Sequence, residues 1–152
     1  MDGGNYMKYS EGKMGRVFIL RLEDGDVLKD CIEKFAEEKN IQVAHVAIVG
    51  AAKDGVIVVG PRDDSAMPFD PVKLPLQRAH EFFATGVIAP LIDGKPILHM
   101  HGSMGKFGQS LTGCIREGVR TWLVGEVIIY EIEGTSAKRL LDEGSGMGLL
   151  AI

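Results

Sequence analysis

The densest group of metal-ligating side chains in this sequence lies between residues 96 and 115 (PILHMHGSMGKFGQSLTGCI), which hold two of the four histidines and one of the two cysteines. If residues 97–101 form a strand, successive side chains point to opposite faces, so His99 and His101 share one face. Two rises of about 3.3 Å separate them by roughly 7 Å along the backbone. Both imidazoles can therefore reach one ion.

The chain can return beside this strand and supply a third ligand. Glycines at positions 102, 105 and 108 are expected to break the strand, which would bring residues 112–115 alongside with Cys114 as the third ligand. A lone cysteine, however, is commonly a small buried hydrophobic residue. Spacing alone leaves two alternatives open: a metal site, or a pair of histidines hydrogen-bonded in a polar pocket.

The composition is that of one globular domain. The 152 residues are 45% hydrophobic and 25% charged, with a net charge of −4, so the chain as a whole does not attract nucleic acid or anionic membranes. No apolar run is long enough to span a bilayer, and the first fifteen residues lack the apolar core of a secretion signal. Two cysteines in different surroundings do not suggest a disulfide framework. We therefore expect a cytoplasmic protein without a membrane partner.

One helix is predicted over residues 26–39. Its apolar residues recur at one-turn spacing and form one stripe: Val27, Leu28, Cys31, Ile32, Phe35 and Ala36. Cys31 is therefore expected to be structural. Asp24 or Asp26 is expected to accept hydrogen bonds from the first free N–H groups of this helix.

Most of the remaining chain has strand character. β-Branched or alternating apolar residues predict strands at 13–22, 41–49, 56–59, 76–88, 96–101 and 119–132. The second and third of these are expected to form a hairpin, and His45 to be a satisfied core or interface histidine. Residues 60–75 hold four of the six prolines and predict a surface loop.

An Asp-Gly turn at residues 93–94 is typical of hairpins. It would pair the strand that contains His80 with the strand that contains His99 and His101. His80 is therefore a fourth, weaker candidate ligand, although the sequence does not fix the register of the two strands.

One helix and six or seven strands predict an α+β fold, with a largely antiparallel sheet flanked by one main helix and room for further short helices. Residues 1–12 are expected to be a flexible leader and residues 13–152 a single domain. The apolar end, residues 148–152, is expected to pack in a sheet or at a subunit boundary. Twenty glycines indicate tight turns and close contacts between strands.

The order of these segments resembles a known family, the plants-and-prokaryotes-conserved (PPC) domain, over about residues 13–142. The resemblance rests on five segments: residues 15–20 (GRVFIL), 47–51 (AIVGA), 84–87 (ATGV), 98–101 (LHMH) and 111–114 (LTGC). It implies an antiparallel sheet flanked by helices and a homotrimer.

The resemblance also implies a metal site. In prokaryotic members a Leu-His-x-His segment and a later Gly-Gly-His-Leu segment line one site, and His99 and His101 match the first segment. Cys114 stands where the family usually has histidine, and His80 stands where many members have glutamate. Because thiolate and imidazole are both good zinc ligands, we expect zinc.

Three classes of function remain. Many family members are labelled DNA-binding, so a DNA-associated or regulatory role is the first expectation, with Arg116 and Arg120 as candidate nucleic-acid-binding residues. The AT-hook (Arg-Gly-Arg-Pro) that accompanies plant members does not occur in the sequence, and the Lys138-Arg139 pair is expected to be surface charge. The alternatives are a metal-dependent enzyme or small-molecule binder, with Glu81 or Glu117 as base, and a trimeric scaffold for protein partners.

Overall fold

The structure, a computed structural model, describes residues 7–152. The predicted leader lies partly outside the described residues, and residues 7–12 have no regular secondary structure. In chain order the elements are β1 (Lys13–Glu23), α1 (Leu28–Glu38), β2 (Ala44–Lys53), β3 (Val56–Pro61), β4 (Pro71–Pro75), β5 (His80–Pro90), β6 (Pro96–Lys106), β7 (Gln109–Glu117), β8 (Arg120–Glu133), β9 (Lys138–Asp142) and β10 (Met147–Ala151).

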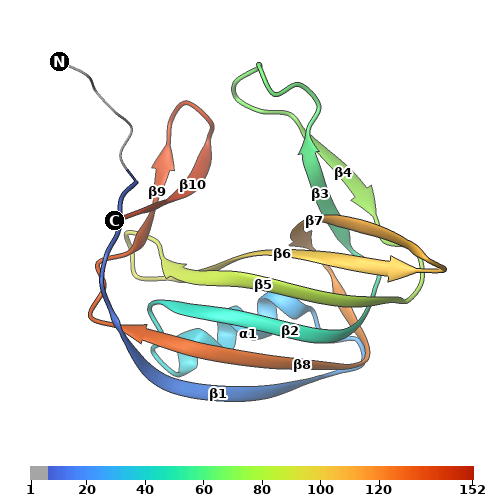
Figure 1. The fold of residues 1–152 in the computed structure, drawn as a ribbon, viewed down its shortest axis with the longest axis horizontal. Helices are drawn as coiled ribbons and strands as arrows, with labels where there is room; N and C mark the ends of the chain where they lie inside the picture. The colour runs from blue at the N-terminus through green and yellow to red at the C-terminus, as the bar shows by residue number, and fades with distance from the viewer. Residues whose placement is uncertain (1–6) are drawn as a thin grey trace.

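Eight strands form one antiparallel sheet in the order β1-β8-β2-β5-β6-β7-β3-β4, and β9 and β10 form a separate hairpin. Figure 1 shows α1 against one face of the sheet, while the β9–β10 hairpin and the β3–β4 arm rise above β5 and β6. The predicted α+β fold with an antiparallel sheet is confirmed. Within residues 7–152 there is one helix, so the further short helices are not found there, and no helix is long and apolar enough to cross a membrane.

The helix packs its apolar stripe on the sheet as predicted. Leu28, Ile32 and Ala36 are fully buried, and Cys31 is partly buried against the same core. The predicted aspartate cap is wrong: Val27 precedes the helix without a side-chain cap. The two aspartates accept hydrogen bonds from neighbouring strands instead. Oδ2 of Asp26 accepts from the backbone N–H of Glu23 in β1. Asp24 accepts from the ammonium group of Lys53 in β2 and from the backbone N–H of Leu123 in β8.

The prediction of a hairpin between residues 41–49 and 56–59 is also wrong. β2 lies between β8 and β5, which occupy both of its edges, so no edge remains for β3. β3 pairs with β7 and β4 instead. The predicted loop at 60–75 is therefore shorter, because β4 takes up its last five residues.

Two of the glycines expected to break the histidine strand lie inside it. β6 continues through Gly102 and Gly105, and the chain turns at Phe107 and Gly108. A Cβ atom at Gly102 would lie 2.8 Å from the Cβ of Ala84. Glycine at this position therefore allows β5 and β6 to approach each other closely, as the high glycine content suggested.

The apolar C-terminal strand does not join the main sheet. β10 pairs with β9, and Leu141, Leu149 and Leu150 remain exposed. The segment therefore lies in a sheet, one of the two predicted alternatives, but in the two-stranded sheet of the hairpin and not in the main one.

An ion pair fixes β1 to β8 and to the end of α1. The Arg16 guanidinium donates to both carboxylate oxygens of Glu131, from Nε to Oε2 at 2.6 Å and from Nη2 to Oε1 at 2.7 Å. Nη2 also donates to the carbonyl oxygen of Lys39 at 2.9 Å. These hydrogen bonds lower the pKa of the buried Glu131 carboxyl.

Glu131→Gln is expected to be less stable than the wild type near neutral pH, and the difference should shrink in acid. A carboxyl whose pKa is lower in the folded chain stabilises the fold above its unfolded pKa, which is about 4.3. That contribution disappears as the pH falls through the folded pKa. The thermal unfolding midpoints of the two proteins should therefore converge between about pH 6 and pH 3. A constant difference over this range would contradict the assignment.

Candidate metal centre

The three predicted ligands meet on the sheet face opposite α1. Along β6 the core-facing residues Leu98 and Met100 are buried, which leaves His99 and His101 on the other face. β7 returns antiparallel, and Cys114 lies directly opposite His101. The prediction that the return strand brings Cys114 alongside is therefore confirmed.

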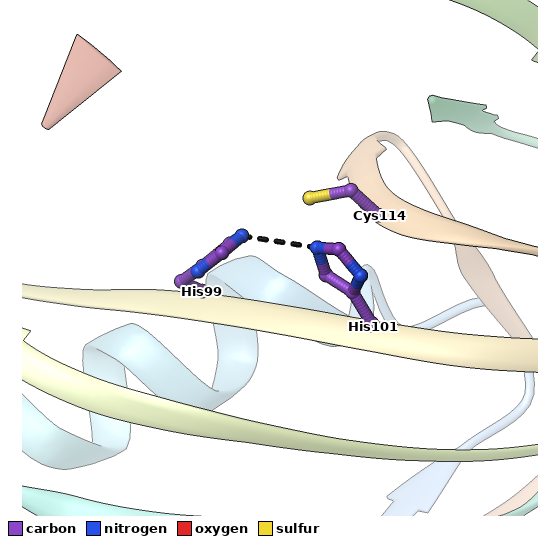
Figure 2. A group of neighbouring side chains, drawn as sticks. All are labelled: His99, His101 and Cys114. Atoms are coloured by element: carbon purple, nitrogen blue, oxygen red, sulfur yellow. Dashed lines mark hydrogen bonds between the residues drawn. The ribbon is translucent and has the colours of Figure 1, made fainter. Parts of the chain in front are cut away.

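The side chains converge as well as the strands. The Nε2 atoms of His99 and His101 are 3.1 Å apart, with the rings nearly perpendicular at 87°. The potential ligand atoms of these two residues and Cys114 all lie within 4.8 Å of one another. Figure 2 shows both imidazoles and the Cys114 sulfur directed toward one space.

This arrangement fits a zinc ion. Zinc binds imidazole nitrogen at about 2.0–2.1 Å in tetrahedral geometry, which places two nitrogen ligands roughly 3.3 Å apart. The observed 3.1 Å between the two Nε2 atoms is close to that value. Two nitrogens and one sulfur are also a donor set that zinc accepts, and they leave a fourth position free of these three residues.

The surroundings of the site keep one histidine neutral. Desolvation by partial burial, followed by the positive charge of Arg139, lowers the pKa of His99 to about 4. His99 is therefore a neutral ligand at pH 7 without any change of protonation. Burial raises the pKa of the Cys114 thiol, so a metal ion would have to displace its proton.

The structure does not bring His80 to this group. Thr85 is the β5 residue opposite His101, and His80 lies five residues further along, roughly 17 Å away. Its Nδ1 instead lies 2.9 Å from the carbonyl oxygen of Arg78. Glu81 is at the same end of β5, opposite Gly105, and is likewise remote from the three ligands.

A cavity of about 1130 Å³ opens beside the histidines. Its walls come from both structures that rise above β5 and β6 in Figure 1: the β3–β4 arm, including Phe69, and the β9–β10 hairpin, including Leu150. His99 and His101 line it from β6. This volume is sufficient for a small organic molecule.

The other candidate residues divide between the cavity and the surface. Arg116 and Glu117 line the cavity, and Glu117 is 3.3 Å from the ammonium group of Lys73. Arg120 donates from Nη1 to the carbonyl oxygen of Gly25 at 3.1 Å and does not line the cavity. Arg116 and Arg120 thus have different surroundings and do not face one common groove.

His45 is hydrogen-bonded, as predicted for a core or interface histidine. Its Nε2 lies 2.7 Å from Oγ1 of Thr85, and its ring stacks on Tyr130. Thr85 in turn is the cross-strand partner of His101. His45 therefore lies on β2, two strands away from the histidines of β6, and outside the group of three ligands.

Arg139 is the site residue that sequence reasoning missed. The Lys138-Arg139 pair was predicted to be surface charge, but Arg139 is only 6% exposed and lines the cavity. The prediction fails because the β9–β10 hairpin folds over β5, a long-range contact. No local pattern in the residues around position 139 indicates this burial.

The chain belongs to the Plants and Prokaryotes Conserved domain family, whose model matches residues 9–133. The resemblance inferred from the sequence is therefore confirmed. A search of curated proteins found no match.

Solved structures with the same fold include a metal-containing protein of Archaeoglobus fulgidus, with 31% identity, a TM-score of 0.83 and coverage of 96% of this chain and 100% of the other. A plant- and prokaryote-conserved protein of Pyrococcus horikoshii has 23% identity and a TM-score of 0.83, covering 96% and 98%. A candidate DNA-binding protein of Ralstonia eutropha has 22% identity and a TM-score of 0.70, covering 88% and 90%. The similarity to the last two structures, at 23% and 22% identity, establishes the fold alone.

Proposed function

We propose that this chain binds one zinc ion through His99, His101 and Cys114 and admits a small molecule to the ion's remaining coordination position. The observation that supports the proposal is the convergence of three ligand atoms within 4.8 Å at the wall of a large cavity. The metal-containing relative from Archaeoglobus fulgidus, at 31% identity, is consistent with it.

Each residue has a distinct part in this proposal. His99, held neutral, and His101 supply nitrogen, and Cys114 supplies a thiolate that offsets one of the two positive charges of the ion. A zinc ion with an open position supplies a Lewis acid that polarises an oxygen of a bound molecule or lowers the pKa of a bound water. Glu117 is the carboxylate in the cavity wall that can accept a proton, whereas Glu81 is too distant.

Cobalt(II) substitution tests both the ligands and the open position. The cobalt protein should show thiolate-to-metal charge-transfer absorption in the near ultraviolet, and Cys114→Ser should lose it. Added imidazole, a neutral ligand, should change the visible bands because it can occupy the fourth position. Visible bands that do not respond to imidazole would mean that the site is closed, and unchanged ultraviolet absorption in Cys114→Ser would exclude the cysteine as a ligand.

We also propose that the protein is a homotrimer. The support is an apolar patch on the sheet face opposite α1, formed by Val17, Ile19, Val49 and Phe83, whose exposed fractions lie between 51% and 81%. The register places these residues on the same face as the histidine pair. Exposed apolar side chains gathered on one face of a sheet are typical of protein interfaces.

A DNA-associated role is the second candidate, because structures with this fold include candidate DNA-binding proteins. It would use Arg116 and Arg120 of several subunits together, since non-specific DNA binding neutralises several phosphates at once. Fluorescence anisotropy with duplex DNA should then show salt-sensitive binding that is weakened in Arg116→Gln/Arg120→Gln. No binding at low salt would exclude this role.

The compartment we propose is the cytoplasm. Both cysteines of the chain are free thiols, and a reducing compartment keeps a Cys114 ligand available for zinc.

A further inference from the structure

Arg139 is a buried cation without a carboxylate partner among residues 7–152. Its Nη1 donates to the carbonyl oxygen of Gly148 at 3.3 Å, and its Nη2 donates to that of Val87 at 3.2 Å. Its Nε is buried without any acceptor. Burying a charged group without an opposite charge costs free energy of folding. An anion bound next to Arg139 would offset this cost, and the described part of the chain does not supply one.

Arg139 lies beside the proposed zinc ligands. Val87, which accepts from its Nη2, is the cross-strand partner of His99. Arg139 also lines the same cavity as His99 and His101. An anion held by Arg139 would therefore lie next to the metal position.

The cavity is positively charged although the whole chain has a net charge of −4. Its charged lining residues are four basic and one acidic: Lys29, Lys73, Arg116, Arg139 and Glu117. Lys73 is paired with Glu117, and Lys29 is paired with Glu33 on α1. This leaves the two guanidinium groups, Arg116 and Arg139, without a carboxylate partner in the part of the chain that the structure describes.

Most of the other residues in the cavity wall are apolar. Phe69, Leu91, Ile97 and Leu150 line it from the β3–β4 arm, the β5–β6 region and the C-terminal hairpin. Such walls bind the hydrocarbon part of a ligand, while a few polar groups fix its orientation.

From these observations we propose that the cavity binds a small organic oxyanion, a carboxylate or a phosphate ester with an apolar body, whose charged group is held by Arg139 and Arg116 beside the metal. This inference rests on the proposed function and names the ligand class of the same site. Arginine suits the task because its planar guanidinium donates to two oxygens of a carboxylate or phosphate at once.

Calorimetric titration of the zinc-loaded full chain tests the proposal with four probes of similar size: benzoate, phenyl phosphate, benzyl alcohol and benzylamine. The two anions should bind at least roughly tenfold more tightly than the neutral alcohol, and the amine should bind most weakly. Whichever anion binds more tightly identifies the oxyanion as carboxylate or phosphate.

Arginine variants locate the binding site. Arg116→Gln and Arg139→Gln should each weaken anion binding by roughly tenfold or more, because each removes a charged donor. Arg21→Gln is the matched control: it removes the same charge from an exposed arginine that is paired with Glu23 on the edge strand β1, at the far side of the sheet. Because Arg139 is buried, its variant can fail to fold, and Arg116→Gln then decides the question.

Three results would each overturn the proposal. The alcohol binds as tightly as the anions, or no probe binds, or Arg116→Gln and Arg21→Gln bind the anions with equal affinity. Zinc content is measured on every sample. A wild-type chain that holds zinc but binds neither anion therefore counts against this inference alone, whereas absence of zinc from the wild type counts against the proposed function.

Discussion

Phe83→Glu is expected to convert the proposed trimer into monomers. Phe83 is 66% exposed on β5 and lies opposite Val49 of β2, in the apolar patch. A carboxylate placed in a closed apolar interface without a partner costs several kcal/mol, and a symmetric assembly incurs that cost at each copy of the interface. Analytical ultracentrifugation of wild type and variant measures the change.

Phe107→Glu provides the matched control for this prediction. Phe107 is 94% exposed at the β6–β7 turn, away from the apolar patch, so the same chemical change should leave the assembly intact. If both variants dissociate, the effect is not specific to the patch. A Phe83→Glu protein that keeps the wild-type mass would contradict the interface.

His101→Ala is expected to weaken zinc binding by roughly a hundredfold or more. Structural zinc sites with four ligands bind with about 10–16 kcal/mol, or about 2.5–4 kcal/mol per ligand, which corresponds to a factor of about 10²–10³. Competition with a chromophoric chelator measures the affinity of each variant. His99→Ala should have an effect of the same size, because both Nε2 atoms contribute to the group.

His80→Ala is the control for the ligand assignment. His80 is a histidine on the neighbouring strand, but its ring lies beside the Arg78 carbonyl oxygen at the far end of β5. The variant should bind zinc with wild-type affinity. A loss comparable to that of His101→Ala would show that the ligand set is different from the one proposed.

The part of the site that could be predicted from sequence depends on short-range structure. The alternation of a single strand puts His99 and His101 on one face, and a hairpin of ordinary length returns Cys114 to His101. The position of His80 could also have been obtained this way. Counting outward from a two-residue turn at Asp93-Gly94 places it opposite residue 107, within one residue of the observed register, in which Glu81 faces Gly105, and well beyond His101.

The rest of the site depends on contacts between distant segments. β3 pairs with β7 rather than with the preceding strand β2, because longer strands already occupy both edges of β2. Arg139 is buried because the C-terminal hairpin packs over β5 and Val87 accepts a hydrogen bond from it. Neither arrangement has a local sequence signal, so the cavity and its positive charge could be recognised only in the folded chain.

The metal content of the purified, untagged protein tests the central claim most directly. Wild-type protein grown with added zinc should contain about one zinc ion per chain, and the His99→Ala/His101→Ala variant should contain almost none while keeping the wild-type circular dichroism spectrum. Wild-type protein without bound metal after zinc supplementation, or a double variant that retains a full equivalent, would contradict a zinc centre formed by His99, His101 and Cys114.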